Sequence, residues 1–255
     1  MSVAARPTVM VVGESWVTHS VHQKGFDSFT TTTYEEGIGW LAPAIEAAGY
    51  ELRFVPNHLV ATAFPTDPDE LARIDAILLS DVGANTLLLG PATFERSERA
   101  PNKLELLRDY VAGGGGLGMV GGYLSFQGID GKANFRNTVL HEVLPAVLPQ
   151  GDDRVEAPQG LTPRIVDDGH AVTAGLPQTL PEILGYNRFA ARDGATVLAT
   201  VGEDPFLVVG THGSGRTLAY ATDCGPHWAP QAFVTDASYD RFWAQAIGWL
   251  AGAQD

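Results

Sequence analysis

The sequence predicts an α/β fold with a mainly parallel central sheet, and three observations support this prediction. Short apolar runs alternate with amphipathic segments, as in successive βαβ units. The apolar runs are continuous rather than alternating, which is typical of strands that are covered on both faces. The 255-residue chain is 45% hydrophobic, which is enough to bury a large core as one domain over residues 1–255.

The first half of the chain supplies four strands and the helices between them. The stretch 34–48 has apolar residues at helical spacing on one face, and Gly49 would end that helix; the inward residues are Ile38, Leu41, Ile45 and Ala48. Four consecutive glycines end the helix before the fourth strand. We expect strands at 8–12, 51–55, 76–79 and 117–120, and helices at 34–48, 69–73 and 103–112.

The C-terminal third of the sequence has a less regular pattern than the first half. Residues 150–195 are rich in Pro, Gly and Asp, and we expect a loop-rich β excursion there. Its acidic run, Asp152, Asp153 and Glu156 around Arg154, is interpreted as a solvated loop with one internal ion pair. The core then resumes with a hairpin-like pair of strands at 196–201 and 205–211, a strand at 216–222 and a helix at 239–250.

Composition excludes several classes of partner. The net charge of −14 leaves no basic stripe for nucleic acid. Cys224 is the single cysteine, so no intramolecular disulfide can form. No run approaches the ~18 apolar residues of a membrane span, and the first residues show no signal-peptide pattern. We therefore expect a cytoplasmic protein with neither a membrane nor a nucleic-acid partner.

A glycine-rich stretch raises the question of a dinucleotide site. Gly116, Gly118 and Gly121 match the G-x-G-x-x-G pattern, but that pattern works only where the glycines follow a strand and open a helix. Here the glycines precede and fill the strand, so we expect no cofactor. The alternative is a strand-to-helix elbow at Gly121 and Gly122, with the N–H groups of the next helix available to an anion.

This elbow and other segments carry a family resemblance over nearly the whole chain. LLSDVGANTLLL, GLGMVGGYLSFQG and GSGRTLAYATDCGPHW resemble the class I glutamine amidotransferase-like superfamily, and more narrowly the bacterial putative glutamine amidotransferases related to trehalose-utilisation proteins. The resemblance implies a flavodoxin-like three-layer sandwich. It also implies a Gly-x-Cys-x-Gly elbow whose cysteine position falls on Tyr123, and a late His-x-Glu pair that falls on His227 and Ala229. Because a phenol is a poor substitute for a thiol, we expect conventional glutaminase chemistry to be lost.

The carboxyl ends of the parallel strands are the expected ligand site. Asn85, near the end of the third strand, lies in the same region. The residues with a predicted catalytic role are Glu14, Tyr123, Cys224 and His227, and those expected to bind substrate are Trp16, Asp81, Gly121, Gly122, Ser125 and Asp223.

Each of these residues also has a structural interpretation. Tyr123 could cap the sheet as a packed aromatic, Ser125 could be a helix N-cap, and Cys224 could be a small buried apolar residue. Asp81 could cap a turn, and Glu14 could bond backbone amides. His19 and His22 lie near Asp27, but the spacing matches no metal motif, and we expect no metal.

Three functions remain open. The preferred one is a binder or enzyme for a small polar metabolite, with a sugar suggested by the trehalose-utilisation relatives. The second is a genuine amidase that uses Cys224 with His227. The third is a non-catalytic oligomeric scaffold with subunit contacts through GGYLSFQG and residues 150–195. We also expect the protein to be a homo-oligomer.

Overall fold

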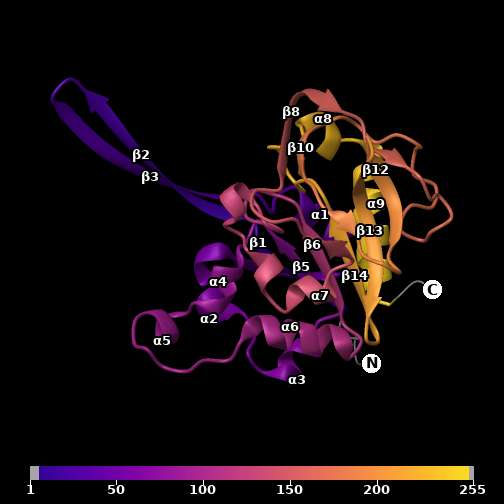
Figure 1. The fold of residues 1–255 in the computed structure, drawn as a ribbon, viewed down its shortest axis with the longest axis horizontal. Helices are drawn as coiled ribbons and strands as arrows, with labels where there is room; N and C mark the ends of the chain where they lie inside the picture. The colour runs from indigo at the N-terminus through magenta and orange to yellow at the C-terminus, as the bar shows by residue number, and fades with distance from the viewer. Residues whose placement is uncertain (1–5, 253–255) are drawn as a thin grey trace.

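A mixed eight-stranded sheet forms the centre of the molecule in this computed structural model, which describes residues 6–252 (Figure 1). The strand order is β4-β1-β5-β6-β14-β13-β12-β9, and the first five strands are mutually parallel. These five strands are β4 (Glu51–Pro56), β1 (Thr8–Gly13), β5 (Ala76–Ser80), β6 (Gly116–Val120) and β14 (Gly215–Tyr220). The remaining three are antiparallel: β13 (Asp204–His212), β12 (Thr196–Val201) and β9 (Arg164–Ile165).

Helices cover both faces of this sheet, which confirms the α/β prediction. On one face α1 (Leu41–Ala47) packs against α9 (Ala237–Leu250). The other face carries α2 (Val60–Ala63), α3 (Pro68–Leu71), α4 (Ala84–Leu88), α6 (Lys103–Ala112) and α7 (Leu140–Val143) (Figure 1). Outside these layers lie the short helices α5 (Pro91–Phe94) and α8 (Gln231–Val234), and the 3₁₀ helices η1 (Asn57–Leu59), η2 (Ile129–Gly131) and η3 (Phe135–Asn137). Strands β5 and β6 are buried at every position, as their continuous apolar runs predicted.

The predicted helix at 34–48 is wrong in its first half. It begins only at Leu41, and Tyr34–Glu36 belong to a strand. Gly37 and Gly39 separate the two elements, and glycine is costly in a helix. Ile38 and Ile45 are nevertheless buried, so the apolar face was predicted correctly although the helix start was not.

A long β-hairpin between β1 and α1 was not predicted. Strand β2 (Ser15–Lys24) pairs with β3 (Asp27–Glu36), and the two strands leave the body as a projecting arm (Figure 1). The sequence contained a partial signal, because the run Thr30–Thr33 is β-branched and a glycine, Gly25, stands where a tight turn can form; in the structure it has a φ of +63°.

Residues 150–195 form small β pairs around the edge of the main sheet. Strand β8 (Arg154–Leu161) pairs with β10 (Ile183–Asn187), and β7 (Ala146–Val147) pairs with β11 (Ala190–Ala191). The solvated-loop interpretation of the acidic run is wrong for Asp153, which is buried and accepts hydrogen bonds from the backbone N–H groups of Gln127 and Gly128. The internal ion pair of Arg154 with Asp152 is confirmed at 2.8 Å.

The prediction of a strand-to-helix elbow after β6 is also wrong, because no helix follows the strand directly. Residues 121–128 form turns, and η2 begins only at Ile129. Side-chain acceptors take the N–H groups that would open a helix: Leu124 donates to Asp81, while Gln127 and Gly128 donate to Asp153. These carboxylates supply partners that the next helical turn would not have provided.

Close packing explains the glycines of β6. A Cβ at Gly116 would lie 2.3 Å from the carbonyl oxygen of Leu250 in α9, and one at Gly118 would lie 2.5 Å from the Leu78 side chain. Such separations are below van der Waals contact, so a side chain at Gly116 would push α9 away from the sheet, and one at Gly118 would displace the Leu78 side chain of the neighbouring strand β5. The G-x-G-x-x-G pattern is therefore a packing feature of this strand.

No helix within residues 6–252 is both long enough and apolar enough to cross a membrane.

Replacing Gly121 by alanine tests the close approach at the end of β6. The new Cβ would lie 2.4 Å from the carbonyl oxygen of Ala221, a backbone atom that cannot swing aside. We expect the free energy of unfolding to fall by about 1–3 kcal/mol, the usual range for overpacking. Gly39→Ala is the matched control, because no atom lies within 4 Å of its added Cβ. Equal urea midpoints for the two variants would contradict this account.

Candidate functional site

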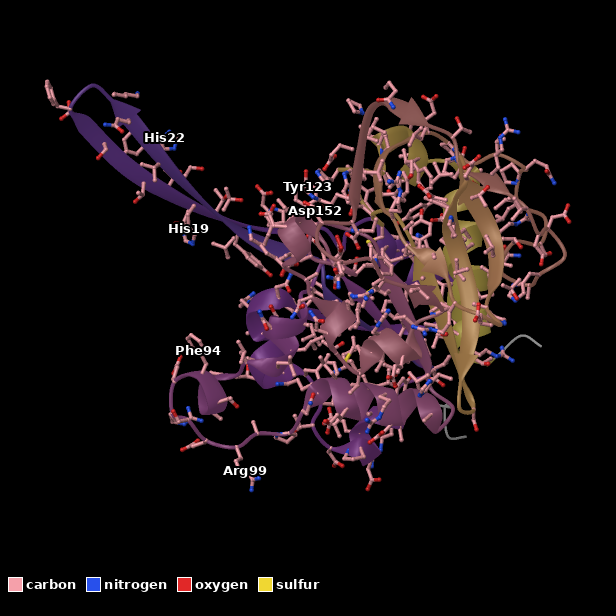
Figure 2. The ribbon with its side chains drawn as sticks, in the orientation of Figure 1. His19, His22, Phe94, Arg99, Tyr123 and Asp152 are labelled. Atoms are coloured by element: carbon pink, nitrogen blue, oxygen red, sulfur yellow. The ribbon has the colours of Figure 1, made fainter. Side chains whose placement is uncertain are left out.

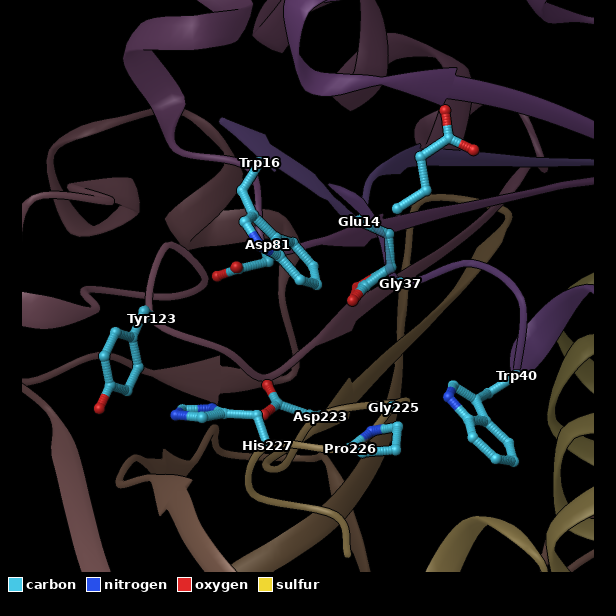
Figure 3. Close-up of a pocket in the computed structure, with 11 residues that line it drawn as sticks. Glu14, Trp16, Gly37, Trp40, Asp81, Tyr123, Asp223, Gly225, Pro226 and His227 are labelled. Atoms are coloured by element: carbon cyan, nitrogen blue, oxygen red, sulfur yellow. The ribbon is translucent and has the colours of Figure 1, made fainter. Parts of the chain in front are cut away.

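A cavity of about 470 Å³ opens at the carboxyl ends of the parallel strands (Figure 3). Glu14 follows β1, Asp81 follows β5, Tyr123 follows β6 and Asp223 follows β14. The chain therefore brings these four predicted residues together at one edge of the sheet, as expected for an open parallel sheet. The lining residues are Glu14, Trp16, Glu36, Gly37, Trp40, Asp81, Tyr123, Asp223, Gly225, Pro226 and His227.

Two of the acidic residues that line the cavity have an unusual backbone conformation. Glu14 has a φ of +42° and Asp81 a φ of +48°, and non-glycine residues adopt this left-handed region uncommonly. Each follows the last residue of a parallel strand. The Glu14 backbone is fixed on both sides, since its N–H donates to the Ser80 carbonyl and its own carbonyl accepts from the Gly37 N–H, each at 2.8 Å. Strained backbone of this kind concentrates at functional sites.

Burial makes Glu14 a proton carrier at neutral pH. Its side chain is 7% exposed and accepts a hydrogen bond of 2.8 Å from the Ser80 hydroxyl. Burial, followed by the charges of Asp81 and Asp223, raises the pKa of Glu14 to about 8. Burial and the charge of Asp223 likewise raise the pKa of Asp81 to about 6. At pH 7 the Glu14 carboxyl is therefore mostly protonated, while Asp81 is mostly ionised.

Asp223 and His227 form a hydrogen-bonded pair on the opposite wall. The Nδ1 atom of His227 lies 2.9 Å from Oδ2 of Asp223, which also accepts the backbone N–H of Trp228 at 2.9 Å. The hydrogen bond with Asp223 raises the pKa of His227 above its usual range. Because Asp223 engages Nδ1, the other ring nitrogen is the position available for proton exchange with a ligand.

Tyr123 stands at the bend after β6 and is anchored by its neighbours. Its hydroxyl donates to Oε1 of Glu156 at 3.0 Å, and the Arg154 guanidinium lies 4.8 Å from the ring centroid. The His227 ring meets the Tyr123 ring edge-on at 4.6 Å. Burial and the bond to Glu156 raise the pKa of the phenol above its usual value. Tyr123 is thus a neutral donor that already has an internal acceptor.

Two N–H groups of the bend donate to internal side-chain acceptors. The N–H of Leu124 donates to Oδ1 of Asp81 at 2.6 Å, and that of Gly122 donates to Oδ1 of Asn187 at 3.0 Å. A Cβ at Gly122 would lie 2.8 Å from that same Asp81 oxygen. Ser125 is not a helix N-cap, as its hydroxyl accepts the Asp81 N–H at 3.0 Å.

Cys224 is fully buried and is not one of the residues that line the cavity. Its sulfur lies 3.7 Å from the Ser80 hydroxyl. Burial and the nearby Glu14 carboxyl raise the pKa of the thiol well above its usual value. A thiol in such surroundings stays protonated and unreactive at neutral pH.

Several lining residues were missed from the sequence. Glu36, Gly37 and Trp40 reach the cavity because the unpredicted hairpin returns the chain to the end of β1. Glu156, which ties Tyr123 to the indole N–H of Trp228, was also missed, because β8 approaches the bend from another part of the chain. Asn85 lies within α4 and does not line the cavity.

The two histidines once considered as metal ligands lie on the hairpin. His19 bonds Thr32 and His22 bonds Thr31, and the two alternate to opposite faces of strand β2. Among residues 6–252 no group of three or more His, Cys, Asp or Glu side chains is arranged to hold a metal ion.

The raised pKa of Glu14 predicts how stability depends on pH. Because the pKa of Glu14 is about 4.5 in the unfolded chain and about 8 in the folded protein, its contribution to the free energy of unfolding falls as pH rises between these two values. We therefore expect wild type to lose stability between pH 5 and 8, and Glu14→Gln, which mimics the protonated acid, to lose less. Thermal unfolding across this range measures the difference, with the exposed Glu46→Gln as control. Parallel curves for wild type and Glu14→Gln would contradict the assignment.

Known structures resemble the whole chain. Cytoplasmic Protein STM3548 from Salmonella typhimurium is 45% identical, with a TM-score of 0.93 over 95% of this chain and 98% of that one. Cytoplasmic Protein STM1381 from Salmonella typhimurium LT2 is 43% identical, with a TM-score of 0.92 over 95% and 99%. A putative ThuA-like protein from Parabacteroides merdae ATCC 43184 shares the fold, at 11% identity and a TM-score of 0.55 over 98% and 91%.

Comparison with curated proteins gives no significant match. The model of the family described as putative glutamine amidotransferase matches residues 8–252, nearly the whole chain. The resemblance carried by the elbow and strand-end segments is thereby confirmed. This protein belongs to the putative glutamine amidotransferase family.

Proposed function

We propose that the cavity binds a small, polar, hydroxyl-bearing metabolite and can transfer protons to and from it. The observation that carries this proposal is the pairing of a protonated acid, Glu14, with the Asp223–His227 pair at one cavity. Titratable groups whose surroundings shift their pKa values are typical components of acid–base sites, and the pKa values of Glu14 and His227 are both raised. The volume of about 470 Å³ falls within the range of small-molecule pockets.

The chemistry of the walls favours an uncharged ligand over an anion. The lining contains four carboxyl groups and one imidazole, and neither Lys nor Arg is among these described residues. Ionised carboxylates such as Asp81 accept hydrogen bonds from hydroxyl groups but repel phosphates and carboxylates. Trp16 and Trp40 add flat apolar surfaces on which a sugar ring can stack. A sugar is therefore the ligand that we favour.

The same geometry supports the loss of conventional glutaminase chemistry. That reaction needs an activated nucleophile and free donors for the tetrahedral oxyanion. Tyr123 is a phenol of raised pKa at the nucleophile position, and its hydroxyl is bonded to Glu156. The first N–H after it, on Leu124, is occupied by the Asp81 carboxylate.

The alternative amidase based on Cys224 has less support. Its thiol is fully buried, is surrounded by Ser80 and Glu14, and has a pKa raised well above the usual value. An attack from this position would need the thiol to become ionised next to carboxyl groups, which the local charge opposes.

A paired ligand screen tests the binding proposal. We expect neutral sugars to raise the melting temperature more than their phosphate esters, because the acidic walls repel the ester. Asp223→Asn should weaken binding of any hit by about 10- to 100-fold, the range for losing a charged hydrogen-bond partner. Isothermal titration calorimetry measures both effects, with Glu46→Gln as the matched surface control. Unchanged melting with every sugar and amide would contradict the proposal.

Ammonia release from glutamine tests the loss of glutaminase chemistry. We expect wild type to release none above background, because the bend offers no thiolate and the Leu124 N–H, the first donor after Tyr123, is bonded to Asp81. Cys224→Ser is the decisive companion variant. Brisk turnover by wild type that this variant abolishes would establish the Cys224 alternative instead, and turnover that survives it would point to a different nucleophile.

A further inference from the structure

The projecting arm, defined as the hairpin of β2 and β3, carries exposed apolar side chains for which the cavity provides no role. Its two ten-residue strands pair from Ser15–Glu36 at the root to Lys24–Asp27 near the tip, and every residue of β3 is exposed. In Figure 1 the arm leaves the body and meets no other element along its outer half. Phe26 at the turn is fully exposed, and Val21 is 73% exposed.

The middle of the arm is unusually poor in charge. Residues 17–23 and 28–34 contain no Asp, Glu, Lys or Arg, although such residues make up 18% of the chain. Exposed strand edges are normally protected by charges or proline, and an isolated two-stranded hairpin is only marginally stable in water. Depletion of charge together with exposed aromatic residues is the composition of interface cores. These features indicate that the arm is covered in the functional assembly.

The body of the same chain presents an apolar patch that begins next to the root of the arm, at Leu59, and extends away from it. The patch consists of Leu59, Leu89 and Phe94, which are 42%, 43% and 77% exposed. Leu59 and Leu89 lie on neighbouring segments, since a Cβ at Gly90 would lie 3.7 Å from the Ala61 carbonyl oxygen, and Phe94 ends α5, which begins directly after Gly90. In Figure 2, Phe94 lies at the outer margin of the molecule, away from the arm.

The arm root and the patch are linked through one short segment. Asn57, two residues before Leu59, donates its side-chain amide to the Ser15 carbonyl at 2.6 Å and its N–H to the Ser15 hydroxyl at 2.8 Å. The Tyr34 ring meets the His58 ring edge-on at 5.0 Å. An arm and an acceptor patch at adjacent places on one chain suit a two-fold arrangement, in which each copy gives its arm and receives the other.

We propose that the arm is a dimerisation arm that lies on the Leu59/Leu89/Phe94 patch of a second copy of this chain. Its ten-residue strands extend about 31 Å, so one face of the ribbon, about 10 Å wide, covers roughly 300 Å². Two arms on two patches then bury roughly 1,200 Å² in total, the lower limit for specific interfaces. The uncharged middle of the arm also lets two chains of like charge, −14 each, associate without bringing their acidic surfaces together.

A second copy also explains the position of the arm relative to the cavity. Trp16 and Glu36, at the root of the arm, line the cavity. Contact with a partner would therefore hold one wall of the site in place. The subunit contacts expected through GGYLSFQG have less support, because Ser125, Phe126 and Gln127 within that stretch are buried inside the subunit.

Sedimentation equilibrium of charge-insertion variants tests the proposal. We expect wild type to sediment at twice 27.1 kDa at micromolar concentration. Val21→Lys/Phe26→Lys in the arm and Phe94→Lys in the patch should each weaken the dimer at least about tenfold, as for interface hot spots. Val166→Lys, on a 57% exposed valine in the excursion, is the matched control and should leave the dimer intact. Thermal unfolding verifies that each variant folds.

A cross-linking experiment then checks which surfaces meet. Cys224 is buried, so Phe26→Cys and Phe94→Cys each supply the one accessible thiol within residues 6–252. Mixing the two single variants, one carrying a tag, with a short bis-maleimide should give a covalent product that contains one copy of each. A monomeric wild type, a dimer indifferent to the arm variants, or a dimer that Phe94→Lys leaves intact would each overturn the proposal.

Discussion

The crowding of carboxyl groups at the carboxyl edge of the sheet is the constraint on which the site depends. Glu14, Asp81 and Asp223 all follow parallel strands. Burial, followed by the charges of Asp81 and Asp223, raises the pKa of Glu14, and burial with the charge of Asp223 raises the pKa of Asp81. The neighbouring groups reduce this repulsion: the Ser80 hydroxyl donates to Glu14, the Leu124 N–H to Asp81, and His227 pairs with Asp223. The result is a site that holds a proton at neutral pH and has ionised neighbours beside it.

Much of the core could be predicted from the sequence because its signals are local. Helix α6 and strand β12 have the predicted bounds, and the other main-sheet strands of the prediction differ by at most two residues at either end. The hairpin was missed because its residues, Thr30–Thr33 among them, alternate on a ribbon that packs on no core. Without a buried face, the two strands lack the regular alternation of apolar and polar residues that reveals a half-buried strand.

The candidate site was predictable to the extent that it depends on strand ends. Parallel topology places Glu14, Asp81 and Asp223 at one edge, whatever the details of the loops. The residues that hold the site from outside the main parallel sheet were not predictable, since Glu156 and Asn187 belong to the β8–β10 pair. Their approach to the bend depends on the three-dimensional path of residues 150–195. No short-range pattern in the sequence predicts that path.

The hydrogen bond between the Leu124 N–H and Asp81 has a consequence for any redesign of this bend. A Tyr123→Cys substitution would place a thiol beside an amide whose proton already goes to Asp81 at 2.6 Å. Freeing that donor would need a second change, at Asp81. A single substitution therefore does not install both a nucleophile and its neighbouring donor, and an engineer would have to rebuild two strand ends together.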